Sequence, residues 1–305
     1  MAITSPSSPH VDTALPEPAP AVLINPVQEE LKLVEELLRS VARVKYAFLA
    51  DILDAIVTAG GKRLRPTVLL LAARFYNYDV EHLVPVGAAI ELLHTASLIH
   101  DDTIDDSLLR RGKPTLNSIL SNGATVLTGD YLFAHAASLS TRSESIRAVR
   151  IFADSLVTIM DGELAQIASG RNPERARENY YARIYAKTAS LFEAACHIGA
   201  VIGQAPEHGI ERLGRYGRQM GMAFQVIDDI LDFQSNTADL GKPVGNDLRH
   251  GTVTLPAMYF MDEARSDDER QLVRSVIEGK VDNDEQVNGA IRLIKESNAL
   301  ELAHR

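Results

Sequence analysis

The feature that most constrains this sequence is a run of aspartates at the end of an apolar helical stretch. Within Ile90–Lys113, the segment IELLHTASLIH is followed by Asp101, Asp102, Asp105 and Asp106. Residues four apart lie on one face of a helix, and like charges at that spacing repel each other. A hard divalent cation such as Mg2+ explains the cluster, because it takes oxygen ligands and bridges carboxylates to substrate phosphates. For one such motif alone, a solvated acidic helix end is the competing interpretation.

A second cluster of the same form favours the metal-binding interpretation. Asp228, Asp229 and Asp232 follow the apolar segment AFQVI, 127 residues after the first motif. Two helices that end this way can face each other across a cavity, with acidic rims above apolar walls. This arrangement suits about two or three Mg2+ ions that hold a diphosphate at the mouth of an apolar pocket. The basic residues expected to meet the phosphate oxygens are Lys62, Arg65, Arg110, Arg111, Lys187 and Lys242.

The segment GGKRLRP concentrates positive charge between two expected helices. Its glycines let the backbone approach a ligand closely. Lys62, Arg63 and Arg65 are candidates to hold phosphate oxygens, the arginines in bidentate fashion. Taken alone, a basic turn of this kind is more often a solvated loop.

Hydrophobic periodicity predicts helices throughout the folded part of the chain. The expected helices are 27–60, 67–76, 83–106, 124–139, 145–167, 180–202, 211–233, 254–264 and 268–302, with a polar turn at 170–177. No segment shows sustained two-residue alternation, so no strands are expected. We therefore predict an all-α fold, in which residues 27–305 form one large helical bundle around a central cavity.

Composition narrows the class of protein further. Residues 1–26 contain six of the thirteen prolines and no Lys or Arg, which predicts a disordered leader rich in Pro, Ser and Ala. The net charge of −10 argues against nucleic acid as a partner. The single cysteine, Cys196, excludes an internal disulfide and fits a cytoplasmic protein. We expect no signal peptide and no apolar run long enough to span a bilayer, although a lipid-like product would favour peripheral membrane contact.

Seven motifs, taken together and in order, make the sequence resemble the trans-type polyprenyl diphosphate synthases. They are GGKRLRP, ELLHTASLIHDDTIDD with RRGKPT, TGDYL, DGELAQ, AKTASLF, GMAFQVIDDILDF and DLGKPVGNDL, and the resemblance covers residues 45–265. The resemblance implies the isoprenoid-synthase fold, a homodimer and an Mg2+-dependent prenyltransferase. In that reaction an allylic diphosphate ionises, isopentenyl diphosphate attacks the cation head-to-tail, and loss of a proton leaves a chain one isoprene unit longer.

The resemblance also implies roles for individual residues. It places the metal ions on Asp101, Asp102, Asp105, Asp228, Asp229 and Asp232. It implies that isopentenyl diphosphate contacts Lys62, Arg65, His94 and Arg111, and that the allylic diphosphate contacts Arg110 and Lys242. Lys187 is also expected to bind substrate. Beside the reacting carbons it places Lys187, Thr188 and Gln225, which complete a catalytic set with Asp101, Asp102, Asp105 and Asp228. Asp130, Glu163 and Gln166 also match family positions, and structural roles are equally open for them.

One departure from the family pattern concerns a phosphate-binding lysine. The family commonly has Gly-Lys-x-Thr-Leu-Pro, where this chain has Thr252 in place of the lysine. Either Arg249 or His250 compensates for the missing charge, or the allylic diphosphate binds more weakly.

The residues before the first motif bear on product length. Ala96 and Ser97 lie five and four positions upstream of Asp101, about one helical turn deeper, where a growing hydrocarbon tail would run. Both are small and leave that path open, which favours a long-chain product of about C30–C50 over geranylgeranyl or farnesyl diphosphate.

Three other classes of protein remain as alternatives. A terpene cyclase would replace the second aspartate motif with an Asn/Asp…Ser…Glu triad, and His250 stands where the serine is needed. A di-iron bundle needs Glu-x-x-His pairs, which Glu91…His94 and Glu301…His304 match only formally. A regulatory subunit of a heteromeric synthase tends to lose an aspartate motif, and both motifs are intact here.

Overall fold

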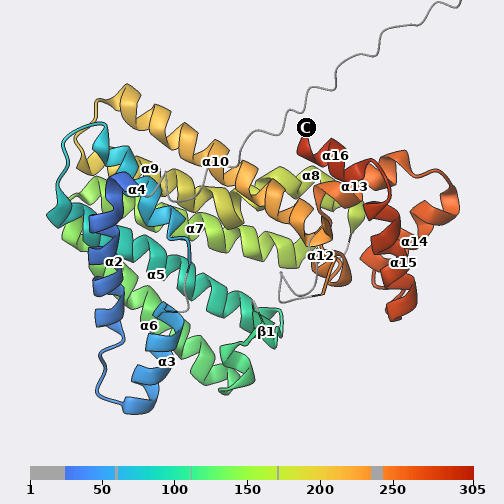
Figure 1. Ribbon diagram of the computed structural model, residues 1–305, viewed down its shortest axis with the longest axis horizontal. Coiled ribbons are helices and arrows are strands. Elements are labelled where there is room, and N and C mark those ends of the chain that lie inside the picture. The colour runs from blue at the N-terminus through green and yellow to red at the C-terminus, as the bar shows by residue number, and fades with distance from the viewer. Residues whose placement is uncertain (1–24, 59–60, 111, 170–171, 235–242) are drawn as a thin grey trace, which may run out of the picture.

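The computed structural model describes residues 25–58, 61–110, 112–169, 172–234 and 243–305. These residues form helices and one short hairpin, which confirms the predicted all-α class (Figure 1). Of the predicted leader 1–26, only Asn25 and Pro26 are described, and they begin a 3-10 turn.

The elements fall into two consecutive groups along the chain. The first comprises η1 Asn25–Val27, α2 Gln28–Val41, α3 Ala47–Thr58, α4 Leu64–Arg74, α5 Val80–Ile104, β1 Leu109–Arg110, β2 Lys113–Pro114, η2 Leu116–Ser118, α6 Asn122–Ser140, η3 Thr141–Ser143 and α7 Ile146–Ser169. The second comprises α8 Pro173–Ile184, η4 Tyr185–Ala189, α9 Ser190–Ile202, α10 Glu207–Gln234, α12 Asn246–Arg249, α13 Leu255–Glu263, α14 Asp267–Ile277, α15 Asp284–Lys295 and α16 Ala299–His304. Element η4 is a π-helix.

Helix α5 lies at the centre of the bundle and is in contact with α2, α4, α6 and α9 (Figure 1). Asp79 begins it, since its carboxylate accepts hydrogen bonds from the first-turn amides of Glu81 and His82. By length and composition it could cross a membrane, unlike any other helix in the described residues, so the expectation that no apolar run is long enough was wrong. However, 72% of its most apolar window is buried inside the protein, as expected for the core helix of a globular bundle.

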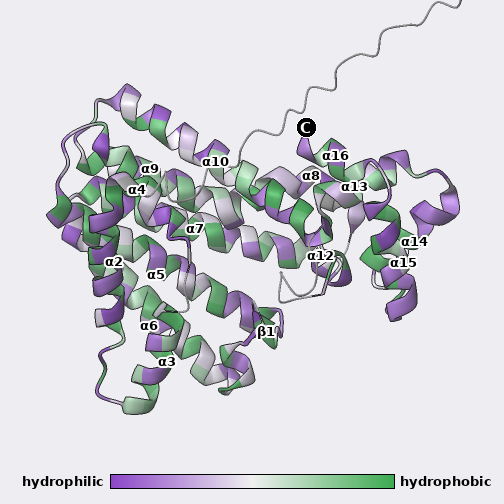
Figure 2. Ribbon diagram, in the orientation of Figure 1, coloured by the Kyte–Doolittle hydropathy of each residue, from purple (hydrophilic) through white to green (hydrophobic). Residues whose placement is uncertain are grey.

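Two apolar cores stabilise the fold. The larger one is built on α2, α4, α5 and α9, and the smaller one joins the end of α10 to α13, α14, α15 and α16. The outer helices α2, α14 and α15 carry polar residues on one side and apolar residues on the other (Figure 2). Each fully buried Leu or Ile contributes about 1.5–3 kcal/mol, so the two cores together hold the long helices in register.

Several predicted boundaries were wrong. The expected helix 27–60 is two helices, α2 and α3, with a turn between them in which the Val44 amide donates to the Ala42 carbonyl. A single straight helix of that length would carry its far end beyond the core, whereas the break lets α3 bury Leu53 and Val57. The segment predicted as a turn at 170–177 begins a helix at Pro173, a residue suited to the first helical position.

The loop after α5 contains a feature that periodicity did not predict. Strands β1 and β2 pair antiparallel, with Leu109 opposite Pro114 and Arg110 opposite Lys113. Gly112 lies between them with a positive φ of 73°, which glycine adopts without steric cost. Two-residue strands are too short to show any alternation, so the sequence pattern carried no signal for them.

Arg63, in the GGKRLRP segment, connects neighbouring helices through its side chain. Its guanidinium donates to Glu35 of α2, to Glu91 of α5 at 2.9 Å, and to the Val57 carbonyl of α3 at 2.6 Å. Its backbone is left-handed, with φ 47°. The suggestion that Arg63 holds a phosphate is therefore corrected, because its partly buried guanidinium joins three helices.

Replacing Arg63 with alanine tests this junction. Because Glu91 would be left buried without its partner, Arg63→Ala should lower the free energy of unfolding by about 3 kcal/mol in urea denaturation. The exposed pair Lys32–Glu29 provides the control. Lys32→Ala should change the free energy of unfolding by less than about 0.5 kcal/mol. Equal effects of the two substitutions would contradict the structural role of Arg63.

Candidate active site

The end of α5 meets a lysine from the π-helix. Lys187 Nζ lies 3.2 Å from Asp101 Oδ2 and 2.9 Å from Glu163 Oε1 of α7. Although burial alone would lower it, Asp101 and Glu163 together raise the pKa of the Lys187 ammonium group. The lysine therefore stays charged beside the first aspartate motif.

The second aspartate of this motif is held by the hairpin. Asp102 is buried, and Arg110 donates to both of its carboxylate oxygens from Nε at 2.9 Å and to Oδ1 from Nη2 at 2.8 Å. Asp105, by contrast, is exposed at the C-terminal end of α5. Burial of part of its side chain raises the pKa of the Asp105 carboxyl, and Lys187 and His250 act against this rise.

The second motif, on α10, also divides into exposed and buried carboxylates. Asp228 is exposed, whereas Asp229 and Asp232 are buried. Asp229 accepts hydrogen bonds from Tyr180 at 2.7 Å and from Gln225 at 2.8 Å. Burial, reinforced by the nearby Asp247, raises the pKa of Asp229 to about 7. Asp232 accepts the backbone amide of Asp247 at 3.1 Å, which fixes the chain after α10 against the motif.

The π-helix connects the two motifs through consecutive residues. Lys187 contacts Asp101, and Thr188 donates its hydroxyl to Gln225 Oε1 at 2.6 Å. Gln225 in turn donates to Asp229. The predicted set of Asp101, Lys187, Thr188 and Gln225 is thus brought together, although no prediction named a π-helix; such turns are frequent at functional sites.

Two glycines let the π-helix lie close to its neighbours. A Cβ at Gly162 of α7 would lie 2.4 Å from Ala186 Cβ, and one at Gly221 of α10 would lie 2.5 Å from Ala189 Cα. Neither space admits a side chain. The DGELAQ motif therefore supplies a glycine for close packing, followed directly by Glu163, the partner of Lys187.

The residues predicted to hold isopentenyl diphosphate lie on neighbouring elements. Lys62 is exposed, and His94 is partly buried on α5. The Arg65 guanidinium lies over the Phe192 ring, 4.8 Å from its centroid, and its buried Nε has no acceptor within the described residues. Burial lowers the pKa of Arg65 to about 10, so it remains a cation. Arg111 and Lys242 lie outside the residues that the structure describes.

The residues predicted to set chain length lie one turn inside α5. Ala96 is fully buried within the larger core, and Ser97 is partly exposed with its hydroxyl bonded to the His94 carbonyl at 2.8 Å. Their assignment to a product path stays a prediction.

The two residues suggested to replace the missing lysine at Thr252 have different surroundings in the structure. Arg249 donates to Asn288 and, at 3.4 Å, to Asp284, both on α15. It is therefore committed to the C-terminal core. His250 donates from Nδ1 to the Asn246 carbonyl at 2.8 Å, and it lies close enough to affect Asp105. Of the two, His250 is the one beside the acidic cluster.

The carboxylates do not form a metal cage by themselves. In the described part of the chain, no three Asp, Glu, His or Cys side chains converge in a way that could hold a metal ion. Mg2+ commonly keeps only one or two protein carboxylates and completes its shell with water and substrate phosphate. The exposed Asp105 and Asp228 suit that kind of partial site.

Two residues near the site were not assigned roles from the sequence. Tyr180, on α8, donates to Asp229, and Asp247, after α10, adds a further carboxylate beside it. Asp247 belongs to the DLGKPVGNDL motif, so its signal was present. Tyr180 belongs to none of the motifs quoted.

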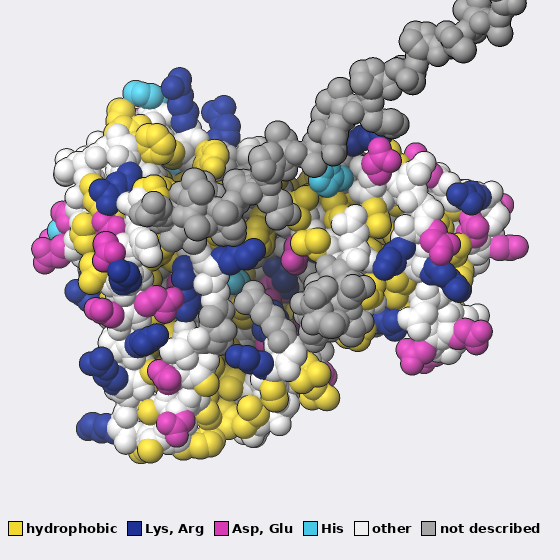
Figure 3. Space-filling model, in the orientation of Figure 1, with side chains coloured by type: hydrophobic (Ala, Val, Ile, Leu, Met, Phe, Trp, Pro, Cys, Tyr) yellow, Lys and Arg dark blue, Asp and Glu magenta, His cyan; other side chains and the backbone are white. Residues whose placement is uncertain are grey.

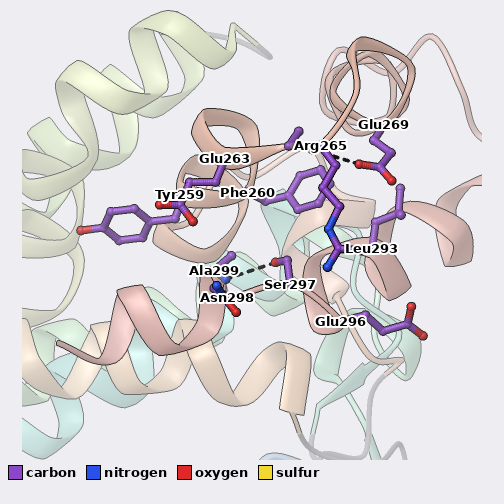
Figure 4. Close-up of a pocket in the computed structure, with 11 residues that line it drawn as sticks. Tyr259, Phe260, Glu263, Arg265, Glu269, Leu293, Glu296, Ser297, Asn298 and Ala299 are labelled. Carbon is purple, nitrogen blue, oxygen red and sulfur yellow. Dashed lines mark hydrogen bonds between the residues drawn. The ribbon is translucent and has the colours of Figure 1, made fainter.

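A partly open cavity of about 120 Å³ lies elsewhere, between α13, α14, α15 and α16. Figure 4 shows Arg265 reaching between Phe260 and Leu293, with Glu296 below it. None of the predicted site residues lines this cavity, so it is separate from the acidic motifs.

The fold and this geometry define a class: helical-bundle proteins with two acidic helix ends joined by cationic and amide side chains. The family model for polyprenyl synthetase matches residues 46–294. The chain belongs to the polyprenyl synthetase family.

Individual relatives agree with this assignment. The chain is 42% identical to heptaprenyl diphosphate synthase component 2 of Geobacillus stearothermophilus, over 78% of this chain and 75% of that protein. It is 40% identical to octaprenyl diphosphate synthase of Escherichia coli, over 73% of this chain and 69% of that protein. Its structure is similar to that of polyprenyl synthase from Caulobacter crescentus complexed with calcium and isoprenyl diphosphate, with a TM-score of 0.88. The two sequences are 34% identical, and the match covers 93% of this chain and 87% of that chain.

The close approach at Gly162 gives a testable prediction. Gly162→Ala should push α7 away from the π-helix and lower the free energy of unfolding by about 1–3 kcal/mol, as overpacking does. Gly123 is a matched control, because a Cβ there meets nothing within 4 Å. Gly123→Ala should leave urea denaturation unchanged or slightly improved; a comparable loss in both variants would rule out the packing explanation.

Proposed function

We propose that this protein condenses isopentenyl diphosphate with an allylic diphosphate, head-to-tail, to make a long-chain polyprenyl diphosphate. The observation that carries the proposal is the pair Lys187–Thr188, which connects both aspartate motifs within one site. The relatives named as heptaprenyl and octaprenyl diphosphate synthases support the reaction class and a long product.

Divalent cations are proposed as the cofactor, with about two or three Mg2+ ions per site. The donor set fits, because Asp101, Asp105 and Asp228 offer carboxylate oxygen at the helix ends. The related Caulobacter structure contains calcium and isoprenyl diphosphate, which supports the same kind of ligand here. When bound, the cations would neutralise charge on the leaving diphosphate.

The side chains divide into those that meet substrate and those that hold the site in place. Asp101, Asp105 and Asp228 would face metal and diphosphate. Asp102 and Asp229 are buried and hydrogen-bonded, so we assign them to positioning Arg110 and Gln225. This assignment refines the expectation that all six aspartates are ligands.

Other residues of the chain would stabilise the changing charge. Arg110 and Lys187 are charged and partly exposed, so each can turn toward phosphate oxygens. The Gln225 carbonyl and the Thr188 hydroxyl place the negative ends of their dipoles near the reacting carbons, where an allylic cation develops. Arg65, with His94 and Lys62, would hold isopentenyl diphosphate.

The function is tested by assaying the purified protein with Mg2+, isopentenyl diphosphate and farnesyl diphosphate. Elongation is expected, and Asp228→Asn should reduce kcat/KM at least a hundredfold, since charge-stabilising groups contribute about 2.7–4 kcal/mol. Asp106→Asn is the control, because Asp106 is exposed and left-handed with φ 48°, a conformation that Asn tolerates. Absence of elongation by the wild-type chain, alone or with a partner subunit, would refute the function.

Product length is tested at Ala96 and Ser97. A phenylalanine at either position should block the path one turn below Asp101 and shorten the product. Ala96 is fully buried, so Ala96→Phe also risks overpacking; Ser97→Phe, at a partly exposed position, tests the same path. An unchanged distribution of products, measured by chromatography, would overturn the assignment of chain length to α5.

We propose that the chain forms a homodimer through an apolar face beside the hairpin. Each of its side chains is more than half exposed: Ile104, Leu108, Leu109, Ile119 and Leu127. Hydrophobic side chains gather along the lower edge in Figure 3, where Figure 1 places α3 and α6. Light scattering should give twice the mass of one chain. A monomer would contradict the proposal, and would favour a heteromeric synthase such as the name of the Geobacillus relative indicates.

A cytoplasmic location with peripheral membrane contact is the remaining part of the proposal. A long apolar product needs a lipid surface to receive it. The cysteine is buried, and burial raises the pKa of Cys196 to about 12, which suits an unreactive thiol in a reducing compartment.

A further inference from the structure

A buried tyrosine lies behind the second aspartate motif. Tyr180, on α8, is 1% exposed, and its hydroxyl donates to Asp229 Oδ2 at 2.7 Å across 49 residues of sequence. Its neighbour Tyr181 is exposed and packs edge-on against the Tyr180 ring. The two adjacent tyrosines therefore differ both in burial and in their contact with the second aspartate motif, which Tyr180 makes through its hydroxyl.

The hydrogen bonds around Asp229 have a fixed direction. Gln225 donates through its amide nitrogen to Asp229 Oδ1 at 2.8 Å, and Tyr180 donates to Oδ2, so both carboxyl oxygens of Asp229 are acceptors in the structure. The Gln225 oxygen is then aimed at Thr188, which donates to it at 2.6 Å. The opposite amide orientation would place a carbonyl oxygen against the carboxylate. The position of Asp229 thus decides which end of Gln225 faces Thr188.

We propose that Tyr180 is a positioning residue for prenyl transfer: its hydroxyl holds Asp229 so that the Gln225 carbonyl and the Thr188 hydroxyl keep the orientation needed beside the reacting carbons. This inference rests on the proposed prenyltransferase function. It adds a residue of α8, outside the quoted motifs, to a series of hydrogen-bonded side chains: Tyr180, Asp229, Gln225 and Thr188.

The surroundings of Tyr180 favour a fixed hydroxyl. Arg183 lies over its ring, 5.5 Å from the centroid, and donates to the Val253 carbonyl at 2.7 Å. The Tyr180 ring contacts both Arg183 and Tyr181 and is almost fully buried, so it has little freedom to turn. If the hydroxyl is removed, Asp229 Oδ2 is left buried without a donor, and the carboxylate must rotate toward another one.

The test compares Tyr180→Phe with Tyr181→Phe in the elongation assay. Tyr180→Phe should lower kcat about tenfold, the loss of one hydrogen bond to a charged group. The KM for isopentenyl diphosphate should stay within about twofold of the wild-type value, because its predicted ligands lie on other elements. Tyr181→Phe should match the wild type in both. A Tyr180→Phe enzyme with wild-type kcat, or one whose kcat and KM change together, would overturn the inference.

Thermal unfolding provides a test that does not depend on turnover. In a double-mutant cycle, Tyr180→Phe and Asp229→Ala, which removes the acceptor, should be coupled, so that the double variant melts no lower than the less stable single variant. Additive shifts in Tm would overturn the contact. Should the wild-type chain show no elongation, the proposed function fails, while this cycle still decides whether Tyr180 fixes Asp229. If Tyr180→Phe unfolds below the assay temperature, Asp229→Asn alone should lower kcat without raising that KM, and normal turnover would contradict the proposal.

Discussion

The constraint on which this structure depends is the repulsion between aspartates gathered at the ends of two core helices. The protein relieves it with cations from other elements, Lys187 for Asp101 and Arg110 for Asp102. Coulomb energies of such pairs are several-fold larger in a partly buried site than in water, so these contacts set the positions of α5, the hairpin and the π-helix relative to one another. The same two cationic side chains are then available to a diphosphate. The residues that stabilise the helix ends are therefore also the residues of the candidate binding site.

Close packing turns this arrangement into a site. Lys187 reaches Asp101 because Gly162 and Gly221 let the π-helix lie against α7 and α10. The wider turn of a π-helix presents Lys187 to one acidic motif and Thr188 to the other. Chemistry and packing are therefore coupled, and a single methyl group on the wrong side of the π-helix would affect both.

The fold class could be predicted from the sequence, and so could several residues that the structure brings together at the candidate site, because their signals are local. Two aspartate motifs at apolar helix ends, and the order of the seven quoted motifs, are visible without coordinates. The π-helix was not predictable, since a five-residue π turn leaves the hydrophobic pattern almost unchanged. The different roles of the aspartates could not be predicted either. Whether Asp229 faces solvent or Tyr180 depends on a contact with a residue 49 positions away in the sequence. Arg63 was misassigned for the same reason, because its partners lie on other helices.

The central claim is that the carboxylates form a partial metal site that a diphosphate completes. Calorimetric titration of the protein with Mg2+, in the presence and absence of inorganic pyrophosphate, tests this most directly. Because Asp101 and Asp102 are already paired with cations and no three described side chains converge on one point, Mg2+ alone should bind weakly, and pyrophosphate should tighten its binding at least tenfold. Equally tight Mg2+ binding with and without pyrophosphate would contradict the account.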